Sequence, residues 1–528
     1  MGIYLNPDAS AYRGIANGRI FIDKSSLIGR LNFSIGDKGS LLCVTMPSRF
    51  GKTYLALMVS AYYTKGDDSS DVFSKLDASN SPDYEKHLNK HNVIRLDIAE
   101  LCDPMGLKDA GAIALSEVKK EMEKAYPDVD FSDCPTLAKL LLRAYGATGE
   151  RFVFVIDEWD YLLRTYPDEP EVADRYISFL RSLFKNSSLK QVIELCYMTG
   201  IMPMKRYGTM SALNEFNEYT MLGPDELAPY FGFSEGEVKK VAAQSGTSIS
   251  LSELKEWYDG YRLEGVGEVY CPNSVVQACR RNFCRDYFAG TAAVSAITMG
   301  LKNSFISLEE ESSILLSGGS VPLDPSTFSS DLSRLDTKDK GLTALVHAGF
   351  LRYDSTMESV TIPNREVALR FYSAVKEIGF SGGLSDLLQR SRDLLDRTLR
   401  GDESFVANTF DEFHARLASL FDKTNEAALS VLASVAYADA VRRYFPLKEP
   451  NLGKGRADIA FIPLRRGELP ALVIELKVDD CVESAIAQIK AKEYYKPLED
   501  YYGDVLLVGI NFDKKTLKHV CKIGRITK

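Results

Sequence analysis

The sequence predicts an α/β protein that contains two separate sheets. Three observations support this prediction: apolar segments of strand length alternate with helical segments between residues 39 and 201, several of those strands end in polar residues, and a second set of strands and helices occupies the last hundred residues. Strands that alternate with helices form a parallel sheet, which binds its ligands at the carboxyl ends of the strands. A chain of 528 residues is long enough for three or four domains.

The composition favours a globular protein whose basic patches are local. The formal net charge is −9, and 45% of the residues are hydrophobic, so any nucleic-acid contact must be confined to part of the surface. Nine cysteines are spread without C-x-x-C pairs, which predicts reduced thiols and no zinc site. The chain begins without a signal-peptide pattern, and no apolar run approaches ~18 residues, so we expect a cytoplasmic location and no membrane partner.

The first sheet is expected to contain buried strands joined by helices. Residues 19–32 have the pattern of a short strand that runs into a helix, and a helical region is expected between the strand at 92–101 and about residue 145. The remaining predicted strands are residues 39–46, 92–101, 151–163 and 191–201.

The segment MPSRFGKT, residues 46–53, lies between a predicted strand and a predicted helix. It supplies the later parts of a phosphate-binding loop: Gly51 for the turn, Lys52 for charge and Thr53 as a Mg²⁺ ligand. Met46 stands where the first glycine of the motif is usual, and Pro47 fixes its own φ. By itself the segment predicts nucleotide binding weakly, because such turns also arise by chance.

A second signal strengthens the prediction of a nucleotide site. VFVIDEWD places Asp157 and Glu158 at the end of an apolar strand, where one carboxylate can hold Mg²⁺ and its neighbour can orient the attacking water. The alternative is an ordinary exposed acidic strand end. Thr199 ends the next strand and could sense the γ-phosphate or simply cap the following loop.

Six motifs in this order resemble bacterial AAA-ATPase-like proteins that carry a C-terminal PD-(D/E)xK nuclease domain, and the resemblance covers nearly the whole chain. The motifs are IFIDKSSLI, PSRFGKTYLALM, VIDEWDYLL, MTGIMPMKRYGTMSALNEF, YFGFSEGEV and WYDGYRL with VYCPNSV. In that family the loop usually reads R-P-R-R-F-G-K-[ST], so the missing glycine is a family trait. Met46 and Ser48 replace two arginines here and leave Arg49 as the loop arginine. The positive charge around the phosphates is therefore reduced, and the sequence predicts ATP binding more strongly than ATP hydrolysis.

The predicted domains follow from this reading. The nucleotide-binding core is expected over residues 1–220 and the DNA-nuclease-like domain over residues 421–528, with a helical lid, a winged-helix-like connector and a helical linker between them. The three intervening parts are residues 221–300, 301–375 and 376–420. The connector could bind DNA or transmit the nucleotide state.

The C-terminal segment holds a second predicted site. Its α-β-β-β-α-β order is that of a restriction-endonuclease-like core, and Asp458, Glu475 and Lys477 form the D…ExK pattern. Alternation along a strand places Glu475 and Lys477 on one face. Two carboxylates there could hold Mg²⁺ on a scissile phosphate while the lysine stabilises the attacking hydroxide. Alone, IELKV is an ordinary strand with an extended lysine.

Further residues are assigned around this site. Gln488 is expected to face it, and Glu426 matches the superfamily's additional metal-orienting acid, although acids on helices are usually solvated. Basic residues near the turns and on the following helix are expected to contact a nucleic-acid backbone without reading sequence. They are Lys454, Arg456, Lys490 and Lys492, with Gln488 beside them.

Together these features predict a protein that binds and hydrolyses ATP and couples this to Mg²⁺-dependent cleavage of DNA, with RNA as the alternative substrate. A role in defence or mobile-element control follows from the resemblance alone. The alternatives are a nucleotide-gated switch that grips nucleic acid or a protein partner without cutting, and a nuclease that binds nucleotide without turning it over. Arg206 acting in trans would imply a homo-oligomer.

Overall fold

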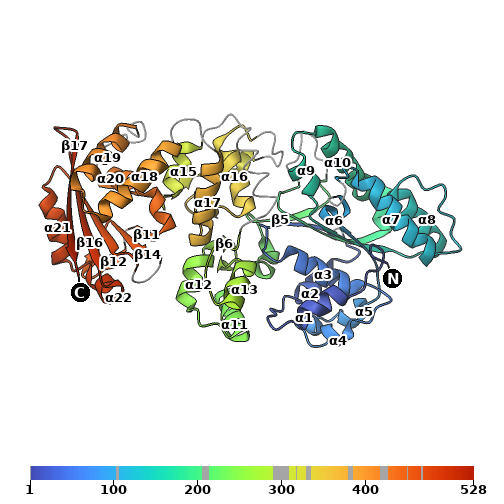
Figure 1. The fold of residues 1–528 in the computed structure, drawn as a ribbon. Helices are drawn as coiled ribbons and strands as arrows, with labels where there is room; N and C mark the ends of the chain where they lie inside the picture. Colours follow the sequence, from blue (N-terminus) through green and yellow to red (C-terminus); the bar gives the residue numbers. More distant parts are fainter. Residues whose placement is uncertain are drawn as a thin grey trace. The chain divides into compact units, whose positions relative to one another are not determined.

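The computed structural model describes most of the chain, and its elements are shown in Figure 1. The described residues are 2–37, 39–102, 106–204, 213–288, 308–316, 318–328, 335–378, 384–416, 426–448, 450–464 and 468–527. The chain divides into two compact units, which are described separately. The N-terminal unit is Met1–Ile306 with Leu323–Asp354, and the C-terminal unit is Ser307–Pro322 with Ser355–Lys528.

The N-terminal unit alternates strands and helices as predicted. Up to the end of the sheet its elements are α1 (Ser10–Ala16), α2 (Leu27–Ser34), β1 (Leu41–Thr45), α3 (Lys52–Tyr63), α4 (Ser70–Phe73), η1 (Asp77–Asn80), α5 (Tyr84–His87), β2 (Asn92–Asp97), α6 (Ile98–Cys102), α7 (Ala110–Ala125), α8 (Leu137–Thr148), β3 (Phe152–Asp157), α9 (Tyr161–Thr165), α10 (Pro170–Phe184), η3 (Ser187–Gln191), β4 (Ile193–Gly200) and β5 (Asn217–Thr220). Beyond the sheet come η4 (Asp225–Tyr230), α11 (Glu235–Ser245), α12 (Leu251–Tyr258), β6 (Tyr261–Leu263), β7 (Gly267–Val269), α13 (Pro272–Arg281), η5 (Pro325–Thr327), α16 (Lys338–Ala348) and β9 (Arg352–Asp354).

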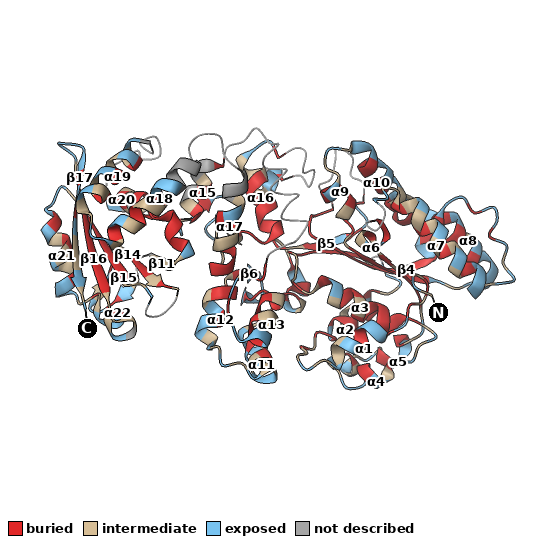
Figure 2. Cartoon of the chain, viewed as in Figure 1, coloured by how far each residue is buried: buried red, intermediate tan, exposed pale blue. Residues whose placement is uncertain are grey.

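The sheet of this unit runs in the order β2-β3-β4-β1-β5, and all its described pairings are parallel. α3 packs against β2, β3 and β4. Helices α7, α8 and α10 share an apolar core with strand residues such as Ile94, Phe154 and Cys196. The strands are accordingly mostly buried in Figure 2. Because the strands are parallel, their carboxyl ends meet at one edge, which is where the predicted site residues belong.

The predicted strand within residues 19–32 is wrong. α2 forms, but the residues before it adopt no regular structure. Their backbone groups bond to side chains instead: the Phe21 N–H donates to Gln244 and its carbonyl accepts from the Gln244 amide, while Ile22 O accepts from the Tyr54 hydroxyl. An extended apolar segment can satisfy its backbone in this way without joining a sheet.

The C-terminal unit contains a mixed sheet with helices on both faces. Its elements are α15 (Glu309–Leu316), β8 (Val321–Pro322), β10 (Ser359–Thr361), α17 (Arg365–Ile378), α18 (Leu384–Leu399), α19 (Glu403–Arg416), α20 (Glu426–Ala436), η8 (Ala438–Arg442), β11 (Tyr444–Lys448), β12 (Asn451–Leu452), β13 (Gly455–Arg456), β14 (Ile459–Pro463), β15 (Ala471–Val478), α21 (Val482–Ala491), α22 (Lys496–Tyr502), β16 (Val505–Asp513) and β17 (Lys518–Ile526). The sheet order is β11-β14-β15-β16-β17, with β15 and β16 parallel and the other neighbours antiparallel.

Alternate residues of β15 serve the two faces of this sheet. Leu472, Ile474 and Leu476 belong to the core formed with α18, α19 and α20, while Val473 belongs to the core formed with α21 and α22. Glu475 and Lys477 therefore share the α21 face, as the sequence predicted. The final strand, β17, was not predicted.

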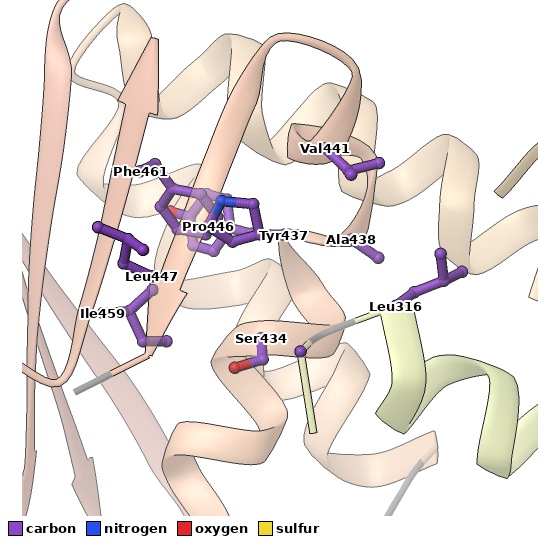
Figure 3. A pocket seen from close by; sticks show the side chains of 10 residues that line it. Leu316, Ser434, Tyr437, Ala438, Val441, Pro446, Leu447, Ile459 and Phe461 are labelled. Atoms are coloured by element: carbon purple, nitrogen blue, oxygen red, sulfur yellow. The ribbon is translucent and has the colours of Figure 1, made fainter. Parts of the chain in front are cut away.

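The predicted connector ends with α16, β9, β10 and α17, which follow one another as helix, strand, strand and helix. The boundary between the units falls inside it, between Asp354 and Ser355. Within the C-terminal unit, a small cavity of about 70 Å³ lies among residues of α20, η8, β11 and β14 (Figure 3). No described helix combines the length and the apolar character needed to cross a membrane.

Candidate functional site

The N-terminal unit contains a cavity of about 460 Å³ beside the loop between β1 and α3. The loop contributes Arg49, Gly51, Lys52 and Thr53, and Glu158 lines the same cavity. α3 begins at Lys52, so its free backbone N–H groups and positive dipole end lie at the loop. The structure thus brings together the predicted loop residues and one of the predicted acids.

The loop does not need a glycine at Met46. Met46 is fully buried and its N–H donates to Gly200 O at the end of β4, 3.1 Å away. The left-handed conformations of the loop fall instead at Arg49, with φ +71°, and at Gly51, with φ +94°. The left-handed turn that the first glycine of the motif usually makes is therefore made at Arg49 and Gly51.

The Lys52 ammonium lies inside the loop. Its Nζ donates to Met46 O at 2.9 Å and to Pro47 O at 3.0 Å. Burial lowers the pKa of Lys52, although Glu158 and Asp157 act in the opposite direction. A phosphate at the helix end would give this buried cation an anionic partner.

Asp157 and Thr199 meet at the carboxyl ends of β3 and β4. The Thr199 hydroxyl donates to Asp157 Oδ1, and both side chains are fully buried. Asp157 Oδ2 is buried and bonds to none of the described residues. An unsatisfied buried carboxylate oxygen beside the phosphate loop suits a divalent cation, which prefers oxygen ligands.

Asp97 is a member of this edge that sequence reasoning missed. It ends β2 and is paired in register with Asp157. Burial, with a contribution from the Asp157 carboxylate, raises the pKa of Asp97 to about 7. Its position could have been predicted, because it ends the strand that immediately precedes the Asp157 strand in the sequence.

The rest of the cavity is mostly apolar, with Lys24 and Asn273 as polar members, and most of it was not predicted. The additional lining residues come from the N-terminal segment and from the region after the sheet: Ile15, Ile20, Phe21, Ile22, Tyr54, Tyr230, Phe233, Pro272, Asn273 and Val276. Tyr261, in the region predicted as a lid, contacts the loop itself, because its ring packs edge-on against Phe50 at 4.9 Å between centroids. An apolar chamber next to a phosphate loop suits a flat heterocyclic base.

In the C-terminal unit, the D…ExK residues converge on Glu475. Lys477 Nζ donates to Glu475 Oε1 at 3.2 Å, and the Gln488 amide on α21 donates to the same oxygen. Asp458, just before β14, accepts from the Leu476 N–H at 2.7 Å. The predicted cluster of two acids, a lysine and a glutamine is therefore assembled.

The charge state of Glu475 is unusual. Burial, reinforced by the nearby Asp458 carboxylate, raises the pKa of Glu475 to about 7. Its Oε2 atom is buried and bonds to none of the described residues. Described residues provide no cluster of three His, Cys, Asp or Glu side chains for a metal. A cation held by Asp458 and Glu475 would therefore complete its coordination with water or phosphate oxygens.

The predicted nucleic-acid residues lie on neighbouring surface segments. Lys454, Arg456, Lys490 and Lys492 are all exposed. The β12–β13 turn is fastened to the end of α21, because the Lys454 N–H donates to Lys492 O at 2.7 Å. Glu426 is exposed at the first residue of α20, and no described bond joins it to Glu475, so its metal-orienting role stays a prediction. Arg206 lies outside the described residues.

Comparisons with known proteins match both halves of the chain. Residues 10–209 match the family model described as "Predicted AAA-ATPase", and residues 430–522 match that of the PD-(D/E)XK nuclease superfamily. An uncharacterized protein from the vnfD 5′ region of Azotobacter chroococcum mcd 1 is 22% identical over 498 residues, which cover 90% of each chain. A structure of the Aeropyrum pernix ORC2 protein in ADPNP-ADP complexes covers 70% of this chain and 94% of its own, with 12% identity and a TM-score of 0.31.

Proposed function

Because this chain joins a predicted AAA-ATPase module to a domain of the PD-(D/E)XK nuclease superfamily, we propose that it binds and hydrolyses ATP to control Mg²⁺-dependent phosphodiester cleavage of DNA. The observation that carries the cleavage half is the convergence of Lys477 and Gln488 on Glu475, which also has a buried oxygen free for a cation. A role in defence or mobile-element control rests on the resemblance of the sequence motifs.

The nucleotide half is supported by the cavity at the loop. The backbone N–H groups at the start of α3 and the Lys52 ammonium would bind the phosphates, and Thr53 and Asp157 would hold the metal. A bound Mg²⁺ neutralises charge on the phosphates. Glu158 would then orient the attacking water and accept its proton, while Thr199 fixes the Asp157 carboxylate through their hydrogen bond.

In the cleavage half, Asp458 and Glu475 would hold the metal. A bound Mg²⁺ polarises the scissile phosphate and makes its water more acidic. Lys477 donates to Glu475, so its charge stands next to the metal ligand and can stabilise negative charge that develops at the phosphate. Gln488 orients the Glu475 carboxylate from the opposite element, α21.

The exposed lysines and Arg456 would position the DNA backbone. Lys454 is partly neutralised by Glu493, 3.1 Å away, so the net attraction is modest and sensitive to salt. Contacts of this kind go to phosphates and carry no sequence information. The proposal therefore expects cleavage with little sequence preference from these residues.

The test is cleavage of linear, circular and single-stranded DNA with Mg²⁺, in the presence and absence of ATP. Asp458→Ala and Lys477→Ala should abolish cleavage, whereas Lys514→Ala, which removes an exposed lysine in the same unit, should not. Lys52→Ala should remove the effect of ATP. RNA substrates test the choice of nucleic acid.

Two outcomes would redirect the proposal. If the wild-type protein binds ATP and DNA but cuts nothing, the chain acts as a nucleotide-gated binding protein. If Lys52→Ala cuts as well as wild type in ATP, cleavage is independent of the nucleotide module.

A further inference from the structure

Arg164 is a buried cation that contacts the proposed catalytic acid of the nucleotide site. It lies on α9, six residues after Glu158 and one turn after Asp160, and its side chain is 3% exposed. One guanidinium nitrogen, Nη2, forms an ion pair with Glu158 Oε2, and another, Nε, donates to Asp160 Oδ2 at 2.8 Å. A single arginine therefore serves two carboxylates, one of which belongs to the proposed reaction.

The two carboxylates are held very differently. Asp160 is fully buried, and its Oδ2 also accepts from the N–H groups of Ile201 at 3.1 Å and Met202 at 2.8 Å. Glu158 is 27% exposed and lines the nucleotide cavity. Its backbone has φ +52°, a conformation that a glutamate adopts at a cost. Asp160 is thus a fixed partner of Arg164, and Glu158 is the partner that can leave.

Movement of Glu158 away from Arg164 does not leave the buried guanidinium without an ionic partner. If Glu158 turned toward the cavity, Arg164 would keep its ion pair with Asp160, so the guanidinium would not be left unpaired in the interior. The ion pair also fixes the direction of the carboxylate, because Oε2 faces the guanidinium while it is paired, whereas a general base must face the water whose proton it accepts. The ion pair and the chemical step therefore compete for the same carboxylate.

We propose that Arg164 is a positioning residue that holds Glu158 in an inactive orientation and releases it when nucleotide and metal occupy the cavity. This inference rests on the proposed ATP hydrolysis and goes beyond it, because it assigns the control of the step to a residue that does not touch nucleotide.

The same network reaches the segment after β4. Asp160 holds the backbone at Ile201 and Met202, which follow Thr199 after Gly200, and Thr199 in turn bonds to the Asp157 carboxylate. Gly200 leaves no room for a side chain here, since an added Cβ would lie 2.3 Å from the Trp159 ring and 2.8 Å from Asp160 Oδ1. A shift of this backbone when metal binds Asp157 would therefore be felt by Asp160 and by Arg164.

The first experiment measures the Glu158–Arg164 coupling without any turnover. It is a double-mutant cycle of four proteins: wild type, Glu158→Gln, Arg164→Lys and the double variant. The measured quantity is the unfolding midpoint of the nucleotide-binding unit in the full chain. Arg164→Lys keeps a cation that can reach Asp160. We expect the two substitutions to be non-additive in nucleotide-free protein and additive with Mg²⁺ and a non-hydrolysable ATP analogue. Coupling that persists with the analogue, or that is absent in both states, would overturn the proposal.

The second experiment separates positioning from a structural role. Arg164→Lys should raise kcat for ATP hydrolysis by about fivefold, the rate factor of one partly exposed ion pair. Asp160→Asn keeps an acceptor for Ile201 and Met202 but leaves Glu158 as the charged partner of Arg164, so kcat should fall by a similar factor. Neither should change the Kd of a fluorescent ATP analogue. A structural role lowers kcat in both variants, and that result would refute the inference.

Failure of the proposed ATP binding or hydrolysis can be told apart from failure of the Arg164 proposal. If Lys52→Ala binds the analogue as tightly as wild type, the nucleotide assignment is wrong, whatever the cycle shows. If wild type binds ATP but does not hydrolyse it, a gain of hydrolysis in Arg164→Lys supports the inference, and continued inactivity overturns it.

Discussion

In the N-terminal unit, Glu158 and Asp160 share the buried guanidinium of Arg164, whereas in the C-terminal unit Glu475 is buried close to a second acid, which raises its pKa to about 7. The first pair of acids is compensated by a cation of the protein itself. At the second site Lys477 also pairs with Glu475, at 3.2 Å, but burial and the Asp458 carboxylate outweigh this pairing and keep the pKa of Glu475 raised. The difference shows that the ion pair of the first site neutralises its acids, whereas the ion pair of the second site still leaves Glu475 open to competition between a proton and a metal.

The largest effect that tests this contrast is expected from Glu475→Gln. The amide keeps the size of the side chain but removes a metal ligand charge, and loss of a direct ligand should cost at least the ~100-fold that outer partners of a metal can cost. DNA cleavage measured at saturating substrate should fall accordingly. Glu483→Gln, an exposed acid in the first turn of α21, is the matched control. Equal activity of the two variants would remove Glu475 from the metal site.

The second expectation concerns pH. Below pH 7, a metal must displace the Glu475 proton, so the Mg²⁺ affinity of the C-terminal site should rise by about tenfold per pH unit and level off above pH 7. Metal titrations monitored by calorimetry measure this slope. In Glu475→Gln the slope should be absent. A pH-independent affinity in the wild type would contradict the argument.

Raising the pH increases the Mg²⁺ affinity through Glu475, but it decreases the stability of the metal-free unit through the same side chain. Between pH 4.5, the ordinary pKa of glutamate, and pH 7, the folded protein keeps the Glu475 proton that the unfolded chain has released. Stability from this group therefore decreases as pH rises through that window. Urea unfolding in a chelator should show the decrease, and Glu475→Gln should abolish it. Added Mg²⁺ should reduce it.

Much of both sheets followed from the sequence. The strands β1, β2, β3 and β4 lie within their predicted ranges, because each is a short apolar run closed by polar or turn residues. The prediction of a strand before α2 was wrong, because apolar composition does not reveal that the Gln244 side chain, more than two hundred residues later, forms hydrogen bonds with the backbone of Phe21. The grouping of the two acids, the lysine and the glutamine at the second site could be predicted, because the motif spacing and the alternation along a strand determine which side chains share one face.

The ion pairs and the burial around the first site could not be predicted in the same way. Arg164 follows VIDEWDYLL immediately, yet nothing local shows that it bonds to both Glu158 and Asp160. Asp97 carried no motif, and its raised pKa arises from burial and from its neighbour in the sheet. Both depend on tertiary packing, which sets the distances and the burial that pattern reasoning lacks.

A smaller effect, limited to the first site, is expected from Gly349→Ala. Gly349 has φ +83°, and a Cβ there would lie 2.7 Å from the Cβ of Pro47 in the phosphate loop. The substitution should displace the loop and weaken ATP binding by about 1–2 kcal/mol, measured with a fluorescent analogue. Gly265→Ala has a similar φ of +82° but open space around the Cβ, so it should leave binding unchanged. DNA cleavage without ATP should be unaffected by either variant.

The smallest effect is expected at the cavity of about 70 Å³ in the C-terminal unit (Figure 3). Ala438 lines this cavity, so Ala438→Val should fill part of it and raise the free energy of unfolding by about 0.5–1 kcal/mol. Ala433→Val is the matched control, because Ala433 is fully buried among core residues of α20 and does not line the cavity; the larger side chain should destabilise there by about 1–3 kcal/mol. Denaturant unfolding measures both. Since neither residue contacts Glu475 or Asp458 in any described bond, the pH dependence of Mg²⁺ binding should survive in Ala438→Val. A changed pH dependence would mean that packing of the helical face, and not the proton on Glu475, controls the second site.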